Sequence, residues 1–223
     1  KHEWKGAGPD EHYFQTAILG LLNFSPKGSK GSVFRDSVKK LGLKGEITSG
    51  YSSSKSKIFV KYLSNFSNLV ILNLNSFNEI VGFEEIYSLP IKGLKIDWGE
   101  SIPNTNEKWG FKKIKTLHLN WRDEGKVTHV DFLAGLASIE NLKLGGGYRS
   151  FSPDFSIEAL KFLRNLKYLK TRDLGFNKTD ILSNLKNLNY VILEEDNLTD
   201  ISGLTSSPNL EFLDLSGSGK LSD

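Results

Sequence analysis

Residues that commonly carry catalysis or bind metals are few in this sequence and poorly grouped. No two histidines stand at the His-x-x-x-His spacing of a helical zinc site. Cys is absent, which excludes thiolate catalysis, Cys-ligated zinc and disulfides. Gly145-Gly146-Gly147 lacks the Gly-Lys-Ser/Thr ending of a phosphate-binding loop, and the chain has no Gly-x-Ser-x-Gly element. We therefore expect no enzyme activity, no metal ion and no cofactor.

A second set of residues has the chemistry of a binding surface. Basic or titratable side chains recur at intervals of 23, 25 and 27 positions, and aromatic side chains recur at intervals of 22. Lysine and arginine attract carboxylates, and aromatic residues and Arg are enriched among residues that dominate binding energy. The candidate partner-binding residues are Lys95, His118, Lys143, Tyr168, Lys170, Arg172, Tyr190, Phe212, Trp98 and Trp121.

The elements that could bring these residues together form a repeat. The pattern apolar-x-x-apolar-x-apolar has seven strong copies, whose second apolar residues lie at positions 72, 94, 117, 142, 169, 191 and 213. A weaker copy, Val38-x-x-Leu41-x-Leu43, precedes them. The alternation predicts a short strand with one buried face. Because one such strand cannot bury that face alone, the copies must stack into a solenoid.

The repeats resemble the leucine-rich repeat family, in particular its SDS22-like and internalin-like bacterial class. The segments Asn197–Leu204 and Asn209–Leu215 carry the resemblance best, and Val130–Leu136 has the same pattern. The resemblance implies an α/β fold, with a curved parallel sheet on the concave side and short helices, 3-10 turns and loops on the convex side. One departure is that no strong copy has the family's Asn three residues after its third apolar residue, so the loops must satisfy their backbone groups differently.

Equivalent positions in successive copies should line up on the inner face of the sheet, because alternate residues of a strand point to the same side. The basic series then forms a central column, the three aromatic residues form the column before it, and Arg172 lies in the column after it. Trp98 and Trp121 lie just past that column, at a rim. The alternative is that the lysines are merely solvated and that the aromatic rings only fill the sheet surface by packing across strands.

Several segments of the chain are expected to differ from the regular repeat. Residues 1–37 predict an N-terminal helical cap, with Asp10 as the helix N-cap, and residues 38–223 predict about eight repeats. The serine-rich segment 49–56 predicts a polar loop, and Ser156–Leu163 predicts a short amphipathic helix on the outer side. Residues 221–223 align with residues 198–200 of the preceding copy, so we expect the last copy to be incomplete and the native protein to continue.

Composition limits the classes of partner. Residues 1–60 carry 10 Lys or Arg and 5 Asp or Glu, a net +5, and the other 163 residues carry 19 and 21, a net −2. This charge is too small to predict a nucleic-acid partner. No apolar stretch approaches the roughly 18 residues of a membrane-spanning helix. We therefore expect a protein partner.

The predicted function is a non-catalytic module that holds a macromolecular partner on its concave face. The resemblance to internalins implies a bacterial secreted or cell-surface protein that engages a host or cell-surface partner, and the absence of Cys and of an initiator Met agrees with export. Two alternatives stay open: a cytoplasmic regulatory or immunity-type binding protein, and the targeting domain of a longer effector enzyme.

Overall fold

The structure is a computed structural model in which the placement of most of the repeat region is described. It covers residues 38–44, 57–77, 79–98, 108–121, 127–146, 151–194, 197–218 and 221. The expected helical cap (1–37), the expected polar loop (49–56) and the last two residues of the incomplete copy lie outside the described residues.

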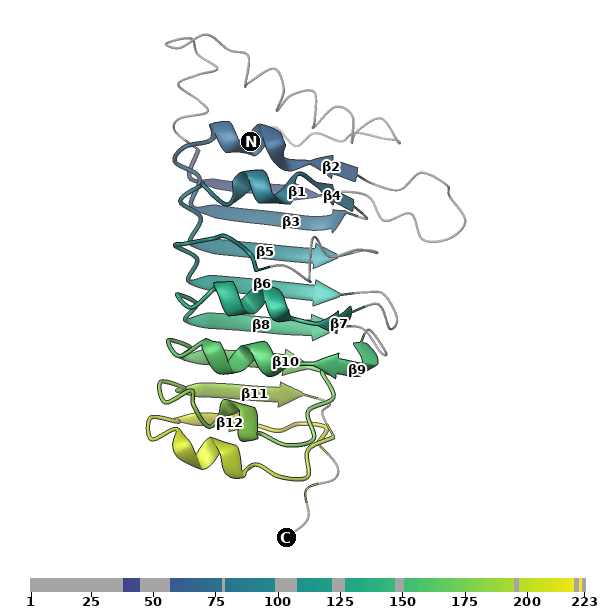
Figure 1. Cartoon of the computed structure of the whole chain (residues 1–223), viewed down its shortest axis with the longest axis vertical. Helices are drawn as coiled ribbons and strands as arrows, with labels where there is room; N and C mark the ends of the chain where they lie inside the picture. Colours follow the sequence, from purple (N-terminus) through teal and green to yellow (C-terminus); the bar gives the residue numbers. More distant parts are fainter. Residues whose placement is uncertain are drawn as a thin grey trace.

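Eight strands form one parallel sheet in which sequence order and spatial order agree (Figure 1). Each strand pairs with the equivalent strand of the next copy, so the sheet extends by one strand with every repeat. This is the solenoid that the repeat predicts. Its strands are β1 (Lys40–Lys44), β3 (Ile71–Phe77), β5 (Gly93–Trp98), β6 (Thr116–Trp121), β8 (Asn141–Gly146), β10 (Tyr168–Arg172), β11 (Tyr190–Glu194) and β12 (Phe212–Asp214).

The strand register follows the predicted alignment of the copies. Leu117 of β6 lies opposite Leu94 of β5 on one side and opposite Leu142 of β8 on the other. All three leucines are buried. The residues that alternate with the buried positions along each strand face the opposite side of the sheet. One buried and one open face therefore result from the leucine alternation, as the sequence predicts.

Two small parallel sheets on the outer side were not predicted. Strand β2 (Lys57–Phe59) pairs with β4 (Glu79–Val81), and β7 (Val127–His129) pairs with β9 (Phe151–Ser156). Ile58 lies opposite Ile80, and both side chains are buried. Each pair joins adjacent copies just beyond the main sheet, where the sequence shows only a few scattered apolar residues.

Among the described residues, short 3-10 helices rather than α-helices cover the core on the outer side, opposite the sheet. The expected amphipathic helix at Ser156–Leu163 is wrong in type and extent, because its first residue belongs to β9 and only Glu158–Phe162 is helical, as a 3-10 turn. In the described part of the chain these turns are η1 (Val60–Asn65), η2 (Phe83–Ile86), η3 (Asp131–Gly135), η4 (Glu158–Phe162), η5 (Asp180–Leu182) and η6 (Ser202–Ser206).

The spacing of the apolar residues explains this choice. In η4 and the residues that follow it, Leu160, Leu163 and Leu166 recur every three residues, and the amide of each donates to the carbonyl three residues earlier at 2.9–3.0 Å. A 3-10 helix has three residues per turn, so this spacing places all three leucines on one side. An α-helix would rotate them progressively away from the core.

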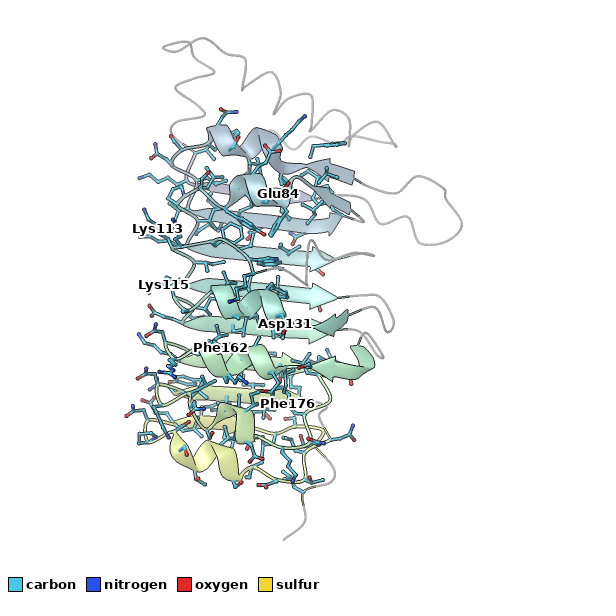
Figure 2. All side chains as sticks on the ribbon, viewed as in Figure 1. Glu84, Lys113, Lys115, Asp131, Phe162 and Phe176 are labelled. Carbon is cyan, nitrogen blue, oxygen red and sulfur yellow. The ribbon has the colours of Figure 1, made fainter. Side chains whose placement is uncertain are left out.

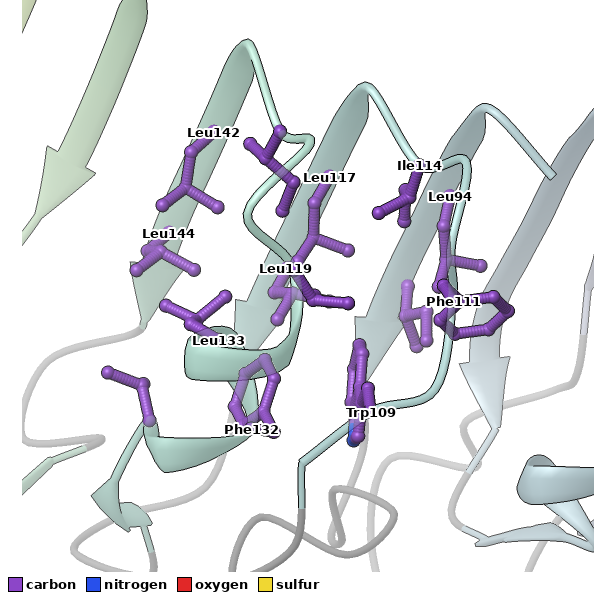
Figure 3. Close-up of a cluster of buried hydrophobic side chains, with 14 of the residues drawn as sticks. Leu94, Trp109, Phe111, Ile114, Leu117, Leu119, Phe132, Leu133, Leu142 and Leu144 are labelled. Atoms are coloured by element: carbon purple, nitrogen blue, oxygen red, sulfur yellow. The ribbon is translucent and has the colours of Figure 1, made fainter. Parts of the chain in front are cut away.

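The core lies between the sheet and these turns (Figure 3). Leucines from the strands meet Phe132 and Leu133 of η3 and Trp109 of the preceding copy. The rings of Trp109 and Phe132 are stacked with centroids 4.2 Å apart, and Phe83 approaches Trp109 at 4.8 Å. Trp109 and Phe132 thereby fill the two middle copies in which the interval between repeats exceeds 22 residues.

Side-chain hydrogen bonds from the loops before the strands also join neighbouring copies. Ser138 Oγ donates to the Ile114 carbonyl at 2.6 Å, Asn165 Nδ2 to Ala137 at 2.9 Å, and Asn187 Nδ2 to Arg164 at 2.8 Å. Each donor directly precedes the first apolar residue of its copy. At the position where the family has Asn, Phe77 and Leu174 are instead buried in the core.

Candidate functional site

The open face of the sheet carries the three predicted columns. Lys95, His118 and Lys143 occupy directly opposed positions on β5, β6 and β8, and Lys170 continues the column on β10. Neighbouring strands in a sheet lie about 4.8 Å apart, so consecutive side chains of this column can act on one bound group. The structure thus brings together four basic or titratable residues that lie 75 positions apart in the sequence, from Lys95 to Lys170.

The aromatic column forms a continuous stack across the last three strands. The ring of Tyr190 lies 6.5 Å from that of Tyr168 and 6.1 Å from that of Phe212, with interplanar angles of 30° and 29°. Such tilted and offset pairs are favourable arrangements for aromatic rings. Stacking does not cover the rings, because Tyr190 stays 43% exposed and Phe212 stays 45% exposed. We call Tyr168, Tyr190 and Phe212 the aromatic ladder.

The basic column and the aromatic ladder meet at one contact. The Lys143 ammonium lies 5.5 Å from the centroid of the Tyr168 ring, on the neighbouring strand. This distance is within the range of a cation–π interaction, which holds the lysine side chain over the first ring of the ladder. The two surfaces are therefore adjacent parts of one face.

Not every lysine of the column is equally available to a partner. Lys170 Nζ lies 2.5 Å from Glu194 Oε1, an ion pair between β10 and β11. Between described residues, neither Lys95 nor Lys143 forms an ion pair. The positive charge of the open face is thus concentrated at its β5–β8 part, and Lys170 serves first to hold Glu194.

His118 lies between two of these lysines and is half-buried. Burial lowers the pKa of His118 below its ordinary value of 6.5, and the positive charges of Lys95 and Lys143 lower it further. Asp97 opposes this shift, but its carboxylate also accepts a hydrogen bond from Asn120 Nδ2 at 3.0 Å. The imidazole is therefore neutral at pH 7, and any negative charge bound beside it would favour its protonation.

The remaining predicted residues lie at the carboxyl edge of the sheet. Arg172 ends β10 and lies opposite Glu194 of β11. Trp98 and Trp121 are the last residues of β5 and β6, with Trp98 opposite Phe77 and Trp121 opposite Gly146. Their backbone positions match the predicted rim.

The sequence analysis missed a further group of charged residues, at the amino edge of the sheet. Glu140 bridges Lys115 at 2.7 Å and Lys167 at 3.0 Å, so three successive copies are linked by ion pairs at the amino edge of the sheet. Lys115 stands at this edge in Figure 2. The signal was available, because each of these residues directly precedes its strand and the three occupy equivalent repeat positions.

The described residues place charged and exposed aromatic side chains on the open face. Among them, no group of three or more His, Asp or Glu side chains is arranged to hold a metal ion. In the same part of the chain, no helix has the length and apolar character that crossing a membrane requires. What the open face does offer is charge and exposed aromatic surface, which are means of binding.

The fold is shared with solved bacterial structures. No family model and no curated protein matches this sequence. The crystal structure of an internalin C2 from Listeria monocytogenes matches with a TM-score of 0.58 and 21% identity, over 100% of this chain and 93% of that chain. The functional domain of InlJ from Listeria monocytogenes, which includes a cysteine ladder, matches with a TM-score of 0.50 and 12% identity, over 83% of this chain and 43% of that chain.

The agreement extends over the whole chain in the first comparison and over most of it in the second. This chain has no Cys, so its copies are held together by leucine packing and backbone pairing without a cysteine ladder. The parallel sheet, the 3-10 turns and the leucine period together identify the protein as a leucine-rich repeat solenoid with the fold of these internalins.

Proposed function

We propose that this protein is a non-catalytic binding module that holds a protein partner against the open, concave face of its sheet. The observation that carries the proposal is the exposed aromatic ladder of Tyr168, Tyr190 and Phe212. Aromatic side chains on the surface of rigid strands lose little conformational entropy on binding and are frequent binding hot spots.

The alternative interpretation of the ladder is that its rings only pack against one another. That interpretation accounts for the stacking but not for the exposure. Tyr190 contacts a ring on each side and still leaves 43% of its surface to solvent. Small hydrophilic residues would suit solvent-exposed positions on this face. Three aligned and exposed aromatic residues therefore favour a surface that contacts a partner.

The size of the face also suits a protein partner. Eight strands at about 4.8 Å span about 34 Å, which matches one side of a standard interface of about 800 Å² per partner. A secreted or cell-surface location is part of the proposal, supported by the fold shared with two internalins. Determining the first thirty codons of the gene tests this part, because an export signal has a charged start followed by an apolar core.

The binding proposal is tested by partner capture from the native source. Tyr168→Ala combined with Tyr190→Ala should abolish capture while the circular dichroism spectrum stays unchanged. Phe162→Ala is the matched control, because Phe162 is an aromatic residue that is 50% exposed on the outer turn η4 (Figure 2). If the double variant captures the same protein at full strength, or if only the control loses capture, the open face is not the binding surface.

A further inference from the structure

The open face is divided into two chemically different halves. Strands β5, β6 and β8 present Lys95, His118 and Lys143, whereas β10, β11 and β12 present the aromatic ladder. The ladder lies two residues nearer the amino ends of the strands than the basic column, since Tyr168 pairs with Asn141 while Lys170 pairs with Lys143. A bound chain would therefore cross the strands on a shallow diagonal.

The two halves are joined without a gap. Lys143 is the last member of the basic half, and its ammonium lies over Tyr168, the first ring of the aromatic half. A ligand with both chemistries can thus pass from one half to the other within one strand spacing. From β5 to β12 the sheet has six strands, whose five spacings span about 24 Å.

We propose that the partner presents one extended peptide segment of about seven residues, with acidic side chains at one end and apolar side chains at the other. The acidic end lies on the basic half of the face, and the apolar end lies on the aromatic ladder. This proposal rests on the proposed function and adds the chemistry of the partner. The residues that receive the segment are Lys95, His118, Lys143, Tyr168, Tyr190 and Phe212.

Charge complementarity distinguishes this segment from a nucleic acid. Aromatic stacks and basic residues also occur together in proteins that bind single strands. In this protein the aromatic half carries acidic neighbours: Asp214 follows Phe212 on β12, and the Tyr190 hydroxyl donates to Glu211 Oε2 at 3.2 Å. A phosphate chain running along the whole face would meet these carboxylates, whereas apolar side chains would not be repelled.

The proposal predicts which peptides the protein selects. A phage-displayed library of random peptides of about 12 residues is panned on the intact chain, and enriched sequences are resynthesised for affinity measurement. Enriched peptides should carry two or more Asp or Glu residues separated from an apolar group by a few positions. Their affinity should fall more than about tenfold in Lys95→Glu/Lys143→Glu and in Tyr190→Ala/Phe212→Ala.

A matched control reverses the same amount of charge elsewhere. Lys112→Glu/Lys113→Glu changes two exposed lysines on the segment before β6, outside the open face, and should leave the affinity within about twofold. A thermal melt of each variant confirms folding. A single-stranded RNA of 12 nucleotides serves as the competing ligand and should bind more weakly than the selected peptides.

The outcomes separate this inference from the proposed function. Four results would each overturn the segment proposal. They are enriched peptides without acidic residues, no enrichment at all, tighter binding of the RNA, and full peptide affinity in Lys95→Glu/Lys143→Glu. If partner capture still depends on Tyr168 and Tyr190 in those cases, the binding function stands without it. If neither Lys95→Glu/Lys143→Glu nor Tyr168→Ala/Tyr190→Ala weakens the binding of any peptide or partner, both proposals fail together.

Discussion

Lys143 and Tyr168 lie on adjacent strands with the lysine ammonium 5.5 Å from the centre of the tyrosine ring. Twenty-five residues separate them in the sequence, and only the stacking of one repeat on the next places them in contact. The contact makes a continuous face out of a basic column and an aromatic column. The behaviour of His118, which neighbours Lys143 in that column, follows from the same arrangement.

His118 should respond to both pH and ligand. Because burial and the charges of Lys95 and Lys143 lower its pKa below 6.5, the folded protein takes up the proton less readily than the unfolded chain. Its contribution to stability is therefore complete above pH 6.5 and decreases as the pH falls below that value. A bound carboxylate favours the protonated imidazole, so the affinity for an acidic peptide should increase as the pH is lowered from 7 toward 5.

Proton NMR titration of the imidazole measures this directly. The apparent pKa of His118 should be below 6.5 in the free protein and should rise when a selected acidic peptide is bound. In His118→Asn, the peptide affinity should lose most of its change over this pH range. Equal pKa values with and without the peptide would show that no negative charge binds next to His118.

The solenoid should fail when a charge replaces a central leucine. Leu142 is fully buried between β6 and β10 repeats, so Leu142→Asp would place a carboxylate in the core without a partner. We expect Leu142→Asp to lower the free energy of unfolding by more than about 4 kcal/mol and to abolish the cooperative unfolding transition in urea. Asn141, the neighbouring residue of β8, is exposed on the open face, so Asn141→Asp should retain a cooperative transition. Equal damage from the two variants would contradict this assignment of the core.

A glycine on the outer side should not tolerate a methyl group. A Cβ at Gly203 would lie 2.0 Å from the Thr179 carbonyl oxygen, because η6 packs directly on the backbone of the preceding copy. Gly203→Ala should lower the free energy of unfolding by more than about 2 kcal/mol. A Cβ at Gly42 meets no atom within 4 Å, so Gly42→Ala should change stability by less than about 0.5 kcal/mol. Urea denaturation compares the two variants, and a Gly203→Ala protein as stable as Gly42→Ala would disprove the close packing of η6.

The ion pairs of Glu140 should give a measurable acid dependence. Hydrogen bonds and charge from Lys115 and Lys167 lower the pKa of Glu140 below its ordinary value of 4.5. The stabilisation is therefore present above pH 4.5 and is lost as the pH falls through the lower folded-state value. The urea midpoint of Glu140→Gln should lie below that of the parent protein at pH 7, and the difference should disappear in strong acid.

Salt provides the control for this electrostatic origin. Because the three side chains are partly exposed, 1 M NaCl should reduce the difference between the parent and Glu140→Gln at pH 7. A difference that persists unchanged in acid and in salt would mean that Glu140 acts through packing instead.

Much of the fold could be predicted from the leucine period. Positions 94, 117 and 142 lie side by side in the sheet because strands of equal length pair in register when their buried residues must share one core. The same argument placed the basic and aromatic residues on the opposite face. The type of the outer elements was not recognised, although the three-residue spacing of Leu160, Leu163 and Leu166 favours a 3-10 turn.

The repeat by itself determined the solenoid, its register and the columns of its open face, because apolar residues at a near-constant interval can be buried only by stacking. Tertiary structure alone decided which of those residues remain available. The pairing of Lys170 with Glu194 and the position of Lys143 over Tyr168 depend on side chains from neighbouring copies. The sequence of one copy does not specify which side chains of the next copy it will contact, so these interactions form only when the copies pack together.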